Sequence, residues 1–593
     1  MKNFFKYFFA SLIAMIVAFV IAIFILIGSI ASLFTFDKQK TVVVKPNTTL
    51  VFELNRPIVD RASANPFENL SFEGISSLSD NSSVGLNKIL ENLKKAKSDE
   101  NIKGILLRPD LLSTGVATIE EIRNGLIDFK ESGKFIISYA DYYSQSAYYL
   151  ASVSDKIYVN PEGAIQFNGL TGTIMLYKHT LEKLGVEPQV IRHGRFKSAV
   201  EPYILDNISP ENRLQIETYL NSIWNHILAG IGKARSIETT TLKQYADQMS
   251  IRNTKNAVDK KMIDGVRYYD EVCAEIKSLT DTTQTGDFNG INLYKYTNAP
   301  DKKSDKLITE QPKIAVIYAQ GSIGTAKGNN NEIGVENISK AFIEARNDKN
   351  IKAVVLRINS PGGSALTSEI ILREAKLTQK AKPLIVSMGN VAASGGYYIA
   401  CAADTIVANP NTITGSIGVF GLMFNAQKLF NNKLGITLNT IKTAEYADIG
   451  SQFRKMTPAE EEIIRQQIVE VYKTFVGHVS EARNMSFDEV DKIGEGRVWT
   501  GIDAKEIGLV DVFGGLTEAI KIAAEKAHVD DYRIVELPKL KDTFTAIFEE
   551  LENEVVARIF SDKIMAVKYF EHITSALKVK GVQARMEYDL DIY

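Results

Sequence analysis

The chain has 593 residues, which is too long for a single hydrophobic core, so at least two domains are expected. Its 69 basic and 71 acidic residues leave a net charge of −2 and form no block of like charge, so no surface for nucleic acid or another polyanion is indicated. The two cysteines lie in different halves and outside any CxxC or Cys/His spacing, so neither a disulfide framework nor a zinc site is indicated.

An apolar segment near the amino terminus predicts a membrane anchor. Residues 7–36 contain no charged side chain and, as a helix, are long enough to cross a hydrocarbon layer about 30 Å thick. Residues 28–32 (GSIAS) resemble a cleavage site, but a cleaved signal peptide has an apolar region of only about 7 to 15 residues. An uncleaved anchor is therefore favoured. Two lysines precede the segment and two follow it, so charge does not fix its orientation.

Strand and helix patterns then alternate in two halves of the chain. The first half shows patterns typical of strands at residues 48–54, 105–107 and 135–137, and a helical pattern at residues 88–97. The second half shows the same order, with strand patterns at residues 314–319, 354–356 and 384–386 and a helical pattern at residues 338–346. Such alternation is typical of βαβ units around a largely parallel sheet. The prediction is an α/β fold in both halves.

Matching residues show that the two halves are repeats. Residues 351–357 (IKAVVLR) echo residues 102–108 (IKGILLR) at an offset of 249, the difference between 351 and 102. The same offset relates Tyr397 and Tyr398 to Tyr148 and Tyr149. We therefore expect two sibling domains of one fold.

A polar stretch at residues 281–306 is typical of a link, and we place the boundary near Ser304. Beyond residue 540, residues 544–560 have a helical pattern and residues 563–578 can form a second helix, without a counterpart in the first repeat. These patterns predict an anchor, a first repeat, a second repeat and a helical extension, at residues 1–40, 45–303, 304–540 and 541–593.

Only the second repeat carries a serine between alanines and glycines. Ser394 lies in the segment 392–396 (AASGG), shortly after the predicted strand at residues 384–386. In the first repeat, Gln145 stands at the matching position. The carboxyl ends of parallel strands commonly build sites, and small neighbours let a substrate backbone approach. Ser394 is thus a candidate nucleophile, and the amide of Gly395 a candidate oxyanion donor. The structural alternative is a helix N-cap serine followed by glycines for close packing.

A second glycine segment strengthens this hypothesis. Residues 357–364 (RINSPGGS) end a predicted strand and open a helix, so they offer free backbone N–H groups. In the first repeat, residues 112–114 (LST) stand opposite residues 361–363 (PGG) and lack both glycines. Because a purely structural turn would recur in both copies, we predict a site in the second repeat.

A serine nucleophile needs a base, and none of the six histidines flanks the glycine segments. A lysine can serve if burial lowers its pKa from about 10.4, because only the uncharged amine accepts a proton. Lys197, in residues 194–203 (GRFKSAVEPY), aligns with Ala447 after one inserted residue. The first repeat thus has a lysine that the second lacks, which favours a site shared between repeats over an ordinary solvated lysine.

Together these motifs resemble the signal peptide peptidase A (protease IV) family in its long, two-repeat, membrane-anchored form. The resemblance covers nearly the whole chain after the anchor and is carried by residues 196–202 (FKSAVEP), 360–364 (SPGGS), 388–398 (MGNVAASGGYY) and 414–418 (TGSIG). It implies two tandem crotonase/Clp-protease-like domains. It also implies a serine endopeptidase that degrades cleaved signal peptides and other apolar, membrane-associated peptides.

The resemblance also assigns roles. Ser394 takes the position of the nucleophile, Lys197 that of the general base and Ser416 that of the hydroxyl that orients the lysine. Gly363 and Gly395 take the positions of the oxyanion donors. Neither a metal nor an organic cofactor is implied. The family further implies a homotetramer, held by a single-pass anchor in the bacterial inner membrane, with its catalytic body outside the cytoplasm.

Two other functions remain open. A crotonase-like enzyme that binds acyl-CoA also uses paired backbone N–H groups, but it needs no lysine from a sister repeat, and no acid/base carboxylates are evident near residues 362–363. A catalytically inactive membrane scaffold would not be expected to keep every dyad and oxyanion position filled. The residues do not decide whether Lys197 reaches Ser394 of its own chain or of a neighbour.

Overall fold

The computed structural model describes Tyr7, Met15 and residues 42–62, 83–110, 112–281, 287–300, 311–325, 327–329, 331–540 and 582–586. Apart from Tyr7 and Met15, the predicted anchor lies outside the described residues, as do the boundary at Ser304 and both helices predicted in the C-terminal extension. No helix within the described ranges is both long and apolar enough to span a membrane.

The first repeat is built on a six-stranded sheet in the order β8-β6-β5-β4-β1-β9, in which every pair of neighbours is parallel. Its strands are β1 (Thr48–Glu53), β4 (Ile102–Arg108), β5 (Phe135–Tyr143), β6 (Lys156–Ile165), β8 (Gly265–Val266) and β9 (Gly290–Asn292). Helices pack on the sheet, including α3 (Leu86–Ser98), α4 (Val116–Lys130), α5 (Gln145–Ala151), α11 (Tyr269–Leu279) and α12 (Leu293–Thr297). Burial of both faces explains why the strands read as continuous apolar runs.

The second repeat has the same architecture. Its sheet runs β19-β17-β15-β13-β10-β21, with β16 beside β15 and β20, and only the β17–β19 pair is antiparallel. The strands are β10 (Lys313–Gln320), β13 (Ile351–Ser360), β15 (Leu384–Ala393), β16 (Thr405–Ala408), β17 (Ile413–Gly415), β19 (Val498–Thr500), β20 (Val512–Phe513) and β21 (Arg533–Leu537). The principal helices are α13 (Val335–Asn347), α14 (Ala365–Gln379), α15 (Gly395–Ala400), α16 (Pro458–Arg483) and α19 (Leu516–Lys526). The prediction of repeated βαβ units around largely parallel sheets is confirmed.

A third sheet, in the order β12-β11-β14-β22-β18-β7, contains strands from both repeats and from the C-terminal extension. These strands are β7 (Glu187–His193), β11 (Ser322–Ile323), β12 (Glu332–Ile333), β14 (Gly362–Ser364), β18 (Val419–Asn425) and β22 (Gln583–Arg585). β7 of the first repeat pairs antiparallel with β18 of the second along its whole length. The two repeats are therefore joined by backbone hydrogen bonds as well as by side chains.

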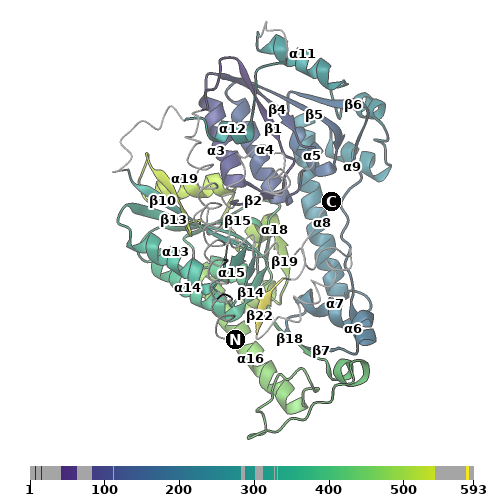
Figure 1. Cartoon of the computed structure of the whole chain (residues 1–593), viewed down its shortest axis with the longest axis vertical. Coiled ribbons are helices and arrows are strands. Elements are labelled where there is room, and N and C mark those ends of the chain that lie inside the picture. The colour runs from purple at the N-terminus through teal and green to yellow at the C-terminus, as the bar shows by residue number, and fades with distance from the viewer. Residues whose placement is uncertain are drawn as a thin grey trace.

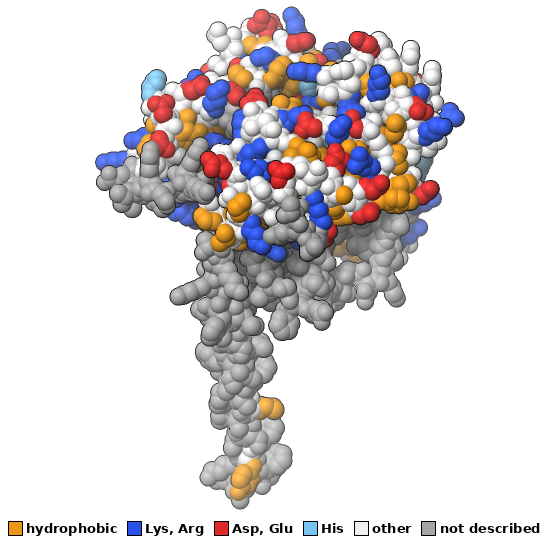
Figure 2. Space-filling model, turned by 90° about the horizontal axis from the view of Figure 1, so that it is seen from above, with side chains coloured by type: hydrophobic (Ala, Val, Ile, Leu, Met, Phe, Trp, Pro, Cys, Tyr) orange, Lys and Arg blue, Asp and Glu red, His pale blue; other side chains and the backbone are white. Residues whose placement is uncertain are grey.

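Short elements complete the described fold: β2 (Ile58–Val59), β3 (Val84–Gly85), α6 (Lys178–Leu184), η1 (Ser198–Val200), α7 (Glu201–Ile204), α9 (Thr239–Asp247), α10 (Thr254–Asp259), η2 (Leu429–Lys433), α17 (Phe487–Ile493) and α18 (Gly501–Glu506). One long helix, α8 (Pro210–Arg235), begins at a Ser209 cap and extends from beside the second repeat into the core of the first (Figure 1). On the face that Figure 2 shows, basic and acidic side chains are interspersed, in keeping with the small net charge.

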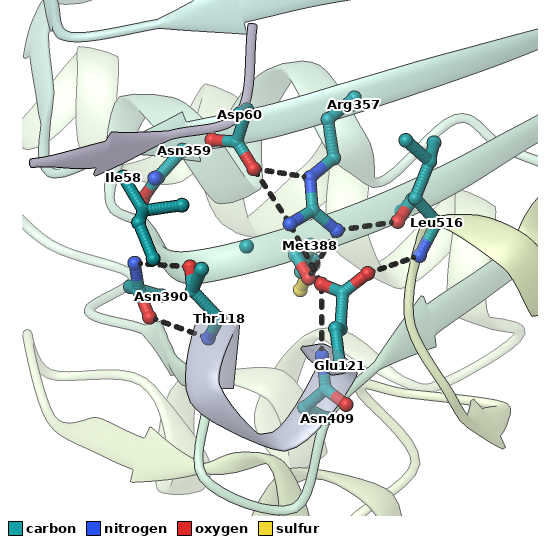
Figure 3. A network of polar contacts seen from close by, with 12 residues as sticks. Ile58, Asp60, Thr118, Glu121, Arg357, Asn359, Met388, Asn390, Asn409 and Leu516 are labelled. Carbon is teal, nitrogen blue, oxygen red and sulfur yellow. Dashed lines mark hydrogen bonds and ion pairs between the residues drawn. The ribbon is translucent and has the colours of Figure 1, made fainter. Parts of the chain in front are cut away.

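A buried ionic cluster locks the repeats together (Figure 3). The guanidinium of Arg357, in β13, donates hydrogen bonds of 2.7 Å to Asp60 and 2.7 Å to Glu121, both from the first repeat. Glu121 also accepts the backbone N–H of Leu516 at 2.7 Å, and burial raises the pKa of its carboxyl. Removal of one partner from such a buried cluster commonly costs about 3–5 kcal/mol. The sheets of the two repeats are thereby held in one fixed relation.

Candidate active site

Ser394 lies at the turn between β15 and α15, in an unusual backbone conformation. Its φ of 55° and ψ of −114° are rarely adopted by a residue with a side chain, and its hydroxyl makes no capping hydrogen bond to α15. The amine Nζ of Lys197 instead donates a hydrogen bond of 2.8 Å to Ser394 Oγ. The turn therefore directs the hydroxyl toward a lysine of the other repeat, within one chain.

Lys197 lies in the loop between β7 and α7, and the loop is held by contacts to the second repeat. The N–H of Phe196 donates to the carbonyl of Glu495 at 3.0 Å. The next residue, Gly496, packs so closely that a Cβ there would lie 2.6 Å from Lys197 Cβ. These contacts direct the lysine side chain inward rather than to solvent. Lys197 is therefore not an ordinary surface lysine, the alternative that the sequence analysis weighed.

The side chain of Glu201 anchors the loop that carries Lys197, and this role was not identified from the sequence. Its fully buried carboxylate accepts hydrogen bonds from Ser209 Oγ at 2.6 Å, Asn212 Nδ2 at 2.9 Å and Arg192 at 3.3 Å. The carboxylate thus joins the end of β7 to the start of α8. The available signal was a single charged residue between the apolar residues of FKSAVEPY, four positions after the lysine.

Ser416 supplies the remaining contacts to the amine. Lys197 Nζ donates to Ser416 Oγ at 3.0 Å and to the Ser416 carbonyl at 3.2 Å. Ser416 follows β17, which pairs with β15, and the N–H of Ser394 donates to the Gly415 carbonyl at 2.8 Å. Adjacent strands therefore fix both serines, and the structure brings Ser416 within hydrogen-bond distance of Lys197.

The three side chains are shielded from solvent: Lys197, Ser394 and Ser416 are 1 %, 0 % and 2 % exposed. Removal from water penalises the charged form of an amine. The three hydrogen bonds described here end on neutral hydroxyl and carbonyl oxygens, which compensate a positive charge less well than a carboxylate does. Burial thus works against the charged form of the amine, and the uncharged form is the one that can accept a proton.

The two glycine segments lie against each other beside Ser394. A Cβ added to Gly362, whose φ is 98°, would lie 2.7 Å from the backbone nitrogen of Gly395. A Cβ on Gly363, with a φ of 156°, would lie 2.0 Å from the Ile323 carbonyl oxygen. Only glycine fits such positions. The structure thus brings the segment that contains Gly363 against Gly395, the residue that follows the serine.

This geometry can activate a hydroxyl and stabilise a developing negative charge. The peptidase family S49 model matches residues 128–283 and 376–530, one segment in each repeat. "Serine protease SPPA, chloroplastic" of Arabidopsis thaliana is 34% identical over 513 residues, covering 86% of this chain and 75% of that protein. "Protease 4" of Haemophilus influenzae is 35% identical over 443 residues, covering 73% of this chain and 71% of that protein.

Solved structures match a smaller part of the chain. ClpP1 from Listeria monocytogenes is 17% identical, and the match covers 34% of this chain and 91% of that chain with a TM-score of 0.23. A score this low leaves the Clp-protease-like and crotonase-like character of the two domains a prediction.

Proposed function

The chain belongs to peptidase family S49, and we propose that it is a serine endopeptidase that uses Ser394 and Lys197 as a catalytic dyad. The observation that carries this proposal is the 2.8 Å hydrogen bond between Lys197 Nζ and Ser394 Oγ. It joins a buried lysine of one repeat to a buried, strained serine of the other. A structural lysine would not need a serine in this conformation, and an acyl-CoA-binding enzyme or an inactive scaffold would need neither residue.

The mechanism follows from the contacts. The uncharged amine of Lys197 takes the proton of Ser394 Oγ while the oxygen attacks the carbonyl carbon of a peptide bond. Lys197 returns the proton to the leaving amine, and water then hydrolyses the ester on Ser394. Ser416 holds the amine in line through its hydroxyl and its carbonyl.

The backbone amides of Gly363 and Gly395 stabilise the oxyanion in this proposal. The close approach of the two glycine segments supports the assignment, because a Cβ on Gly362 would lie only 2.7 Å from the backbone nitrogen of Gly395, the residue after the serine. Loss of one donor from an oxyanion hole commonly costs about 3–4 kcal/mol, or roughly a hundredfold or more in rate. The required chemistry is complete with these residues and water.

The substrates we propose are apolar peptides associated with membranes, including cleaved signal peptides. The predicted anchor at residues 7–36 supports this proposal, because a single-pass anchor keeps the site beside the membrane where such peptides occur. We place the protein in the bacterial inner membrane with its catalytic body outside the cytoplasm. Vesicle flotation of the full chain and protease protection in cells test the anchor and its orientation.

We further propose that the chain assembles into a homotetramer, and the repeat symmetry supports this. β18 of the second repeat pairs with β7 of the first. Their counterparts are residues 170–176 in the first repeat, where Gly169 and Gly172 echo Gly418 and Gly421, and residues 437–443 in the second. Neither counterpart is in a strand.

Both counterparts carry exposed apolar side chains, although Leu170 and Ile174 of the first pack on the core of its repeat. Met175 is 46 % exposed, and Leu438 and Ile441 are 45 % and 99 % exposed. The strand pairing that joins repeats within a chain can therefore form again between chains, head to tail, and such an interface closes into a ring when the rotation allows. In light scattering of the detergent-solubilised protein, Ile441→Asp should reduce the mass from tetramer to smaller species. An unchanged mass would contradict the proposed interface.

The proposed activity is tested by cleavage of an apolar fluorogenic peptide by the detergent-purified full chain. Wild type is compared with Ser394→Ala and Lys197→Ala at several pH values. Loss of cleavage in both variants, with circular dichroism unchanged, supports the dyad. Near-normal cleavage by either variant overturns it.

A further inference from the structure

Gln215 is a buried amide side chain to which the proposed mechanism gives no role. It lies in the second turn of α8 and is 4 % exposed. Its Nε2 donates hydrogen bonds to Ser198 Oγ at 2.6 Å, to the Phe196 carbonyl at 3.3 Å and to Asn212 Oδ1 at 3.0 Å. Burial of an amide costs free energy unless such hydrogen bonds are made, so these partners explain how α8 can bury it.

Two of these partners are the residues on either side of Lys197. Phe196 and Ser198 are also joined to each other, since the Ser198 hydroxyl donates to the Phe196 carbonyl at 3.2 Å and the Ser198 N–H donates to it at 2.8 Å. Gln215 therefore holds the lysine loop on both flanks of the proposed base. The backbone of Lys197 is fixed as a result, because it lies between two fixed neighbours.

The other end of the Gln215 amide binds the second repeat. Its Oε1 accepts the backbone N–H of Val498, the first residue of β19, at 3.3 Å. β19 pairs with β17, the strand that Ser416 follows. The N–H of Ser416 also donates to the carbonyl of Arg497, the residue before β19, at 2.7 Å. One side chain thus connects the loop that carries Lys197 to the strands that fix Ser416.

The same groups surround one small cavity. Gln215, Ser198 and Val498 line it together with Lys197 and Ser416. Its volume is about 20 Å³, which is room for about one water molecule. Little space is therefore left for the lysine loop to shift while the amide stays in place.

The second repeat has no glutamine at the matching position. α8 and α16 begin at residues 210 and 458, an offset of 248, so Ile463 stands opposite Gln215. That repeat also lacks a counterpart of Lys197. The amide and the lysine thus occur in the same copy, as expected of two residues with a joint role.

We propose that Gln215 is a positioning residue that sets Lys197 against Ser394 and Ser416. The inference rests on the proposed peptidase function. Nε2 holds the lysine loop and Oε1 holds β19, so the base keeps one relation to both serines. Without the amide, the 2.8 Å hydrogen bond between Lys197 Nζ and Ser394 Oγ is made less often. The backbone contact of the loop with Glu495 remains, so alignment is lost and the fold is kept.

Steady-state kinetics of Gln215→Leu test the proposal. Leucine fills a similar space and makes no hydrogen bond. The kcat for an apolar peptide should fall roughly tenfold to a hundredfold, as when a catalytic group is displaced by about 1 Å. KM should stay unchanged, because no contact with the substrate is removed.

Ser222→Ala is the matched control. Ser222 lies two turns further along the same face of α8, and its hydroxyl contacts Thr500 Oγ1 of β19 at 3.0 Å. The variant therefore removes a contact between the same two elements, away from the lysine loop. Its kcat should equal that of wild type.

A double variant separates positioning from a structural role. If Gln215 acts only through Lys197, its removal costs nothing once the lysine is absent, because residues that act as a unit have effects that do not add. Lys197→Ala combined with Gln215→Leu should therefore hydrolyse a reactive p-nitrophenyl ester at the same residual rate as Lys197→Ala alone. If leucine prevents folding, Gln215→Glu takes its place. It keeps the acceptor for Val498 but cannot donate to the Phe196 carbonyl, and the same fall in kcat is expected.

The outcomes distinguish the inference from the function on which it rests. The inference is wrong, and the dyad stands, if the folded Gln215 variant keeps the wild-type kcat or if Ser222→Ala loses as much. It is also wrong if the double variant loses about tenfold or more beyond Lys197→Ala. If Lys197→Ala cleaves the apolar peptide like wild type, the proposed function itself fails.

Discussion

In both repeats a serine directly precedes the corresponding helix, but the two serines differ in role, and Ser144 stands one position before Gln145, the residue that matches Ser394. In the first repeat Ser144 precedes α5 with φ −62° and ψ 162°, and its hydroxyl accepts the N–H of Ala147 at 3.2 Å as an ordinary cap. In the second repeat Ser394 precedes α15 with a positive φ and makes no cap. The comparison teaches that the candidate nucleophile arises from a changed backbone, which releases the hydroxyl from the helix and turns it toward Lys197.

Glycines make the changed backbone possible. In the second repeat Gly395 and Gly396 stand where the first has Ser146 and Ala147. A Cβ on Gly396 would lie 2.8 Å from the Ser360 carbonyl oxygen, so the turn packs too tightly for alanine. A strained residue such as Ser394 costs about 1–3 kcal/mol and persists only where its surroundings enforce it.

The largest expected effect is the loss of activity when the Ser394 hydroxyl is removed, and it tests the contrast between Ser394 and Ser144 directly. Ser394→Ala should lower kcat for an apolar peptide by roughly 10⁴- to 10⁶-fold, the range found when a catalytic serine is removed. The matched variant Ser144→Ala should keep full activity and lower the free energy of unfolding by about 1 kcal/mol, because it removes only a cap. Steady-state kinetics and chemical denaturation of both variants measure the two effects. A loss of activity in Ser144→Ala would mean that the two serines are not separated by role.

Lys197→Ala should lose nearly as much activity as Ser394→Ala, because the two residues act as one unit. The double variant should lose little more, since such effects are not additive. In wild type kcat/KM should fall on acidification, because a protonated amine cannot accept the serine proton. Lys243→Ala, an exposed lysine of the same repeat, is the control. Additive losses in the double variant would argue for independent roles.

The buried ionic cluster offers a second contrast between the repeats. Arg357 is buried beside Asp60 and Glu121, whereas its counterpart Arg108 is part-exposed beside Glu53 at 2.8 Å. Arg357→Met should lower the free energy of unfolding by about 3–5 kcal/mol. Arg108→Met should lower it by about 0–1 kcal/mol. Equal effects in urea denaturation would contradict the importance of the interface between repeats.

The pH dependence of Arg357→Met follows from Glu121. Burial raises the pKa of this carboxyl in the folded state, so the folded state binds more protons than the unfolded state. The free energy of unfolding is therefore highest below the unfolded-state pKa and falls as pH rises through the folded-state pKa. Without the guanidinium, which opposes the rise, the fall should be steeper than in wild type. Denaturation between about pH 4 and 8 checks the difference.

The smallest effect on activity is expected at Ser416. Removal of its hydroxyl leaves the Ser416 carbonyl at 3.2 Å from Lys197 Nζ, so the amine keeps one of these two contacts. A lost hydrogen bond of this kind is worth about 1.5–3 kcal/mol if the amine is charged during the reaction, which corresponds to roughly a tenfold to hundredfold loss of kcat. Kinetics of Ser416→Ala should show this loss without a change in KM. No loss at all would mean that Ser416 does not orient the base.

The strands, helices and repeats were predictable because they depend on local patterns of apolar residues. Apolar runs and the 249-residue offset between residues 102 and 351 give the strands, their order and the two repeats. The helix predicted at residues 88–97 is α3, which extends slightly further at both ends. The unmatched glycines and the unmatched Lys197 also pointed to residues that the structure brings together, because a residue present in one copy only needs a separate explanation.

The sequence by itself determined the repeated α/β units and the residues of the candidate site. The tertiary structure decided what depends on distance: Lys197 reaches Ser394 of its own chain across 197 positions, Glu201 holds the lysine loop, and Arg357 joins the repeats. It also decided that β22 (Gln583–Arg585) pairs with β14 beside Gly363. The physical reason is that periodicity records which face of an element is buried, whereas it carries no information about which distant element covers that face.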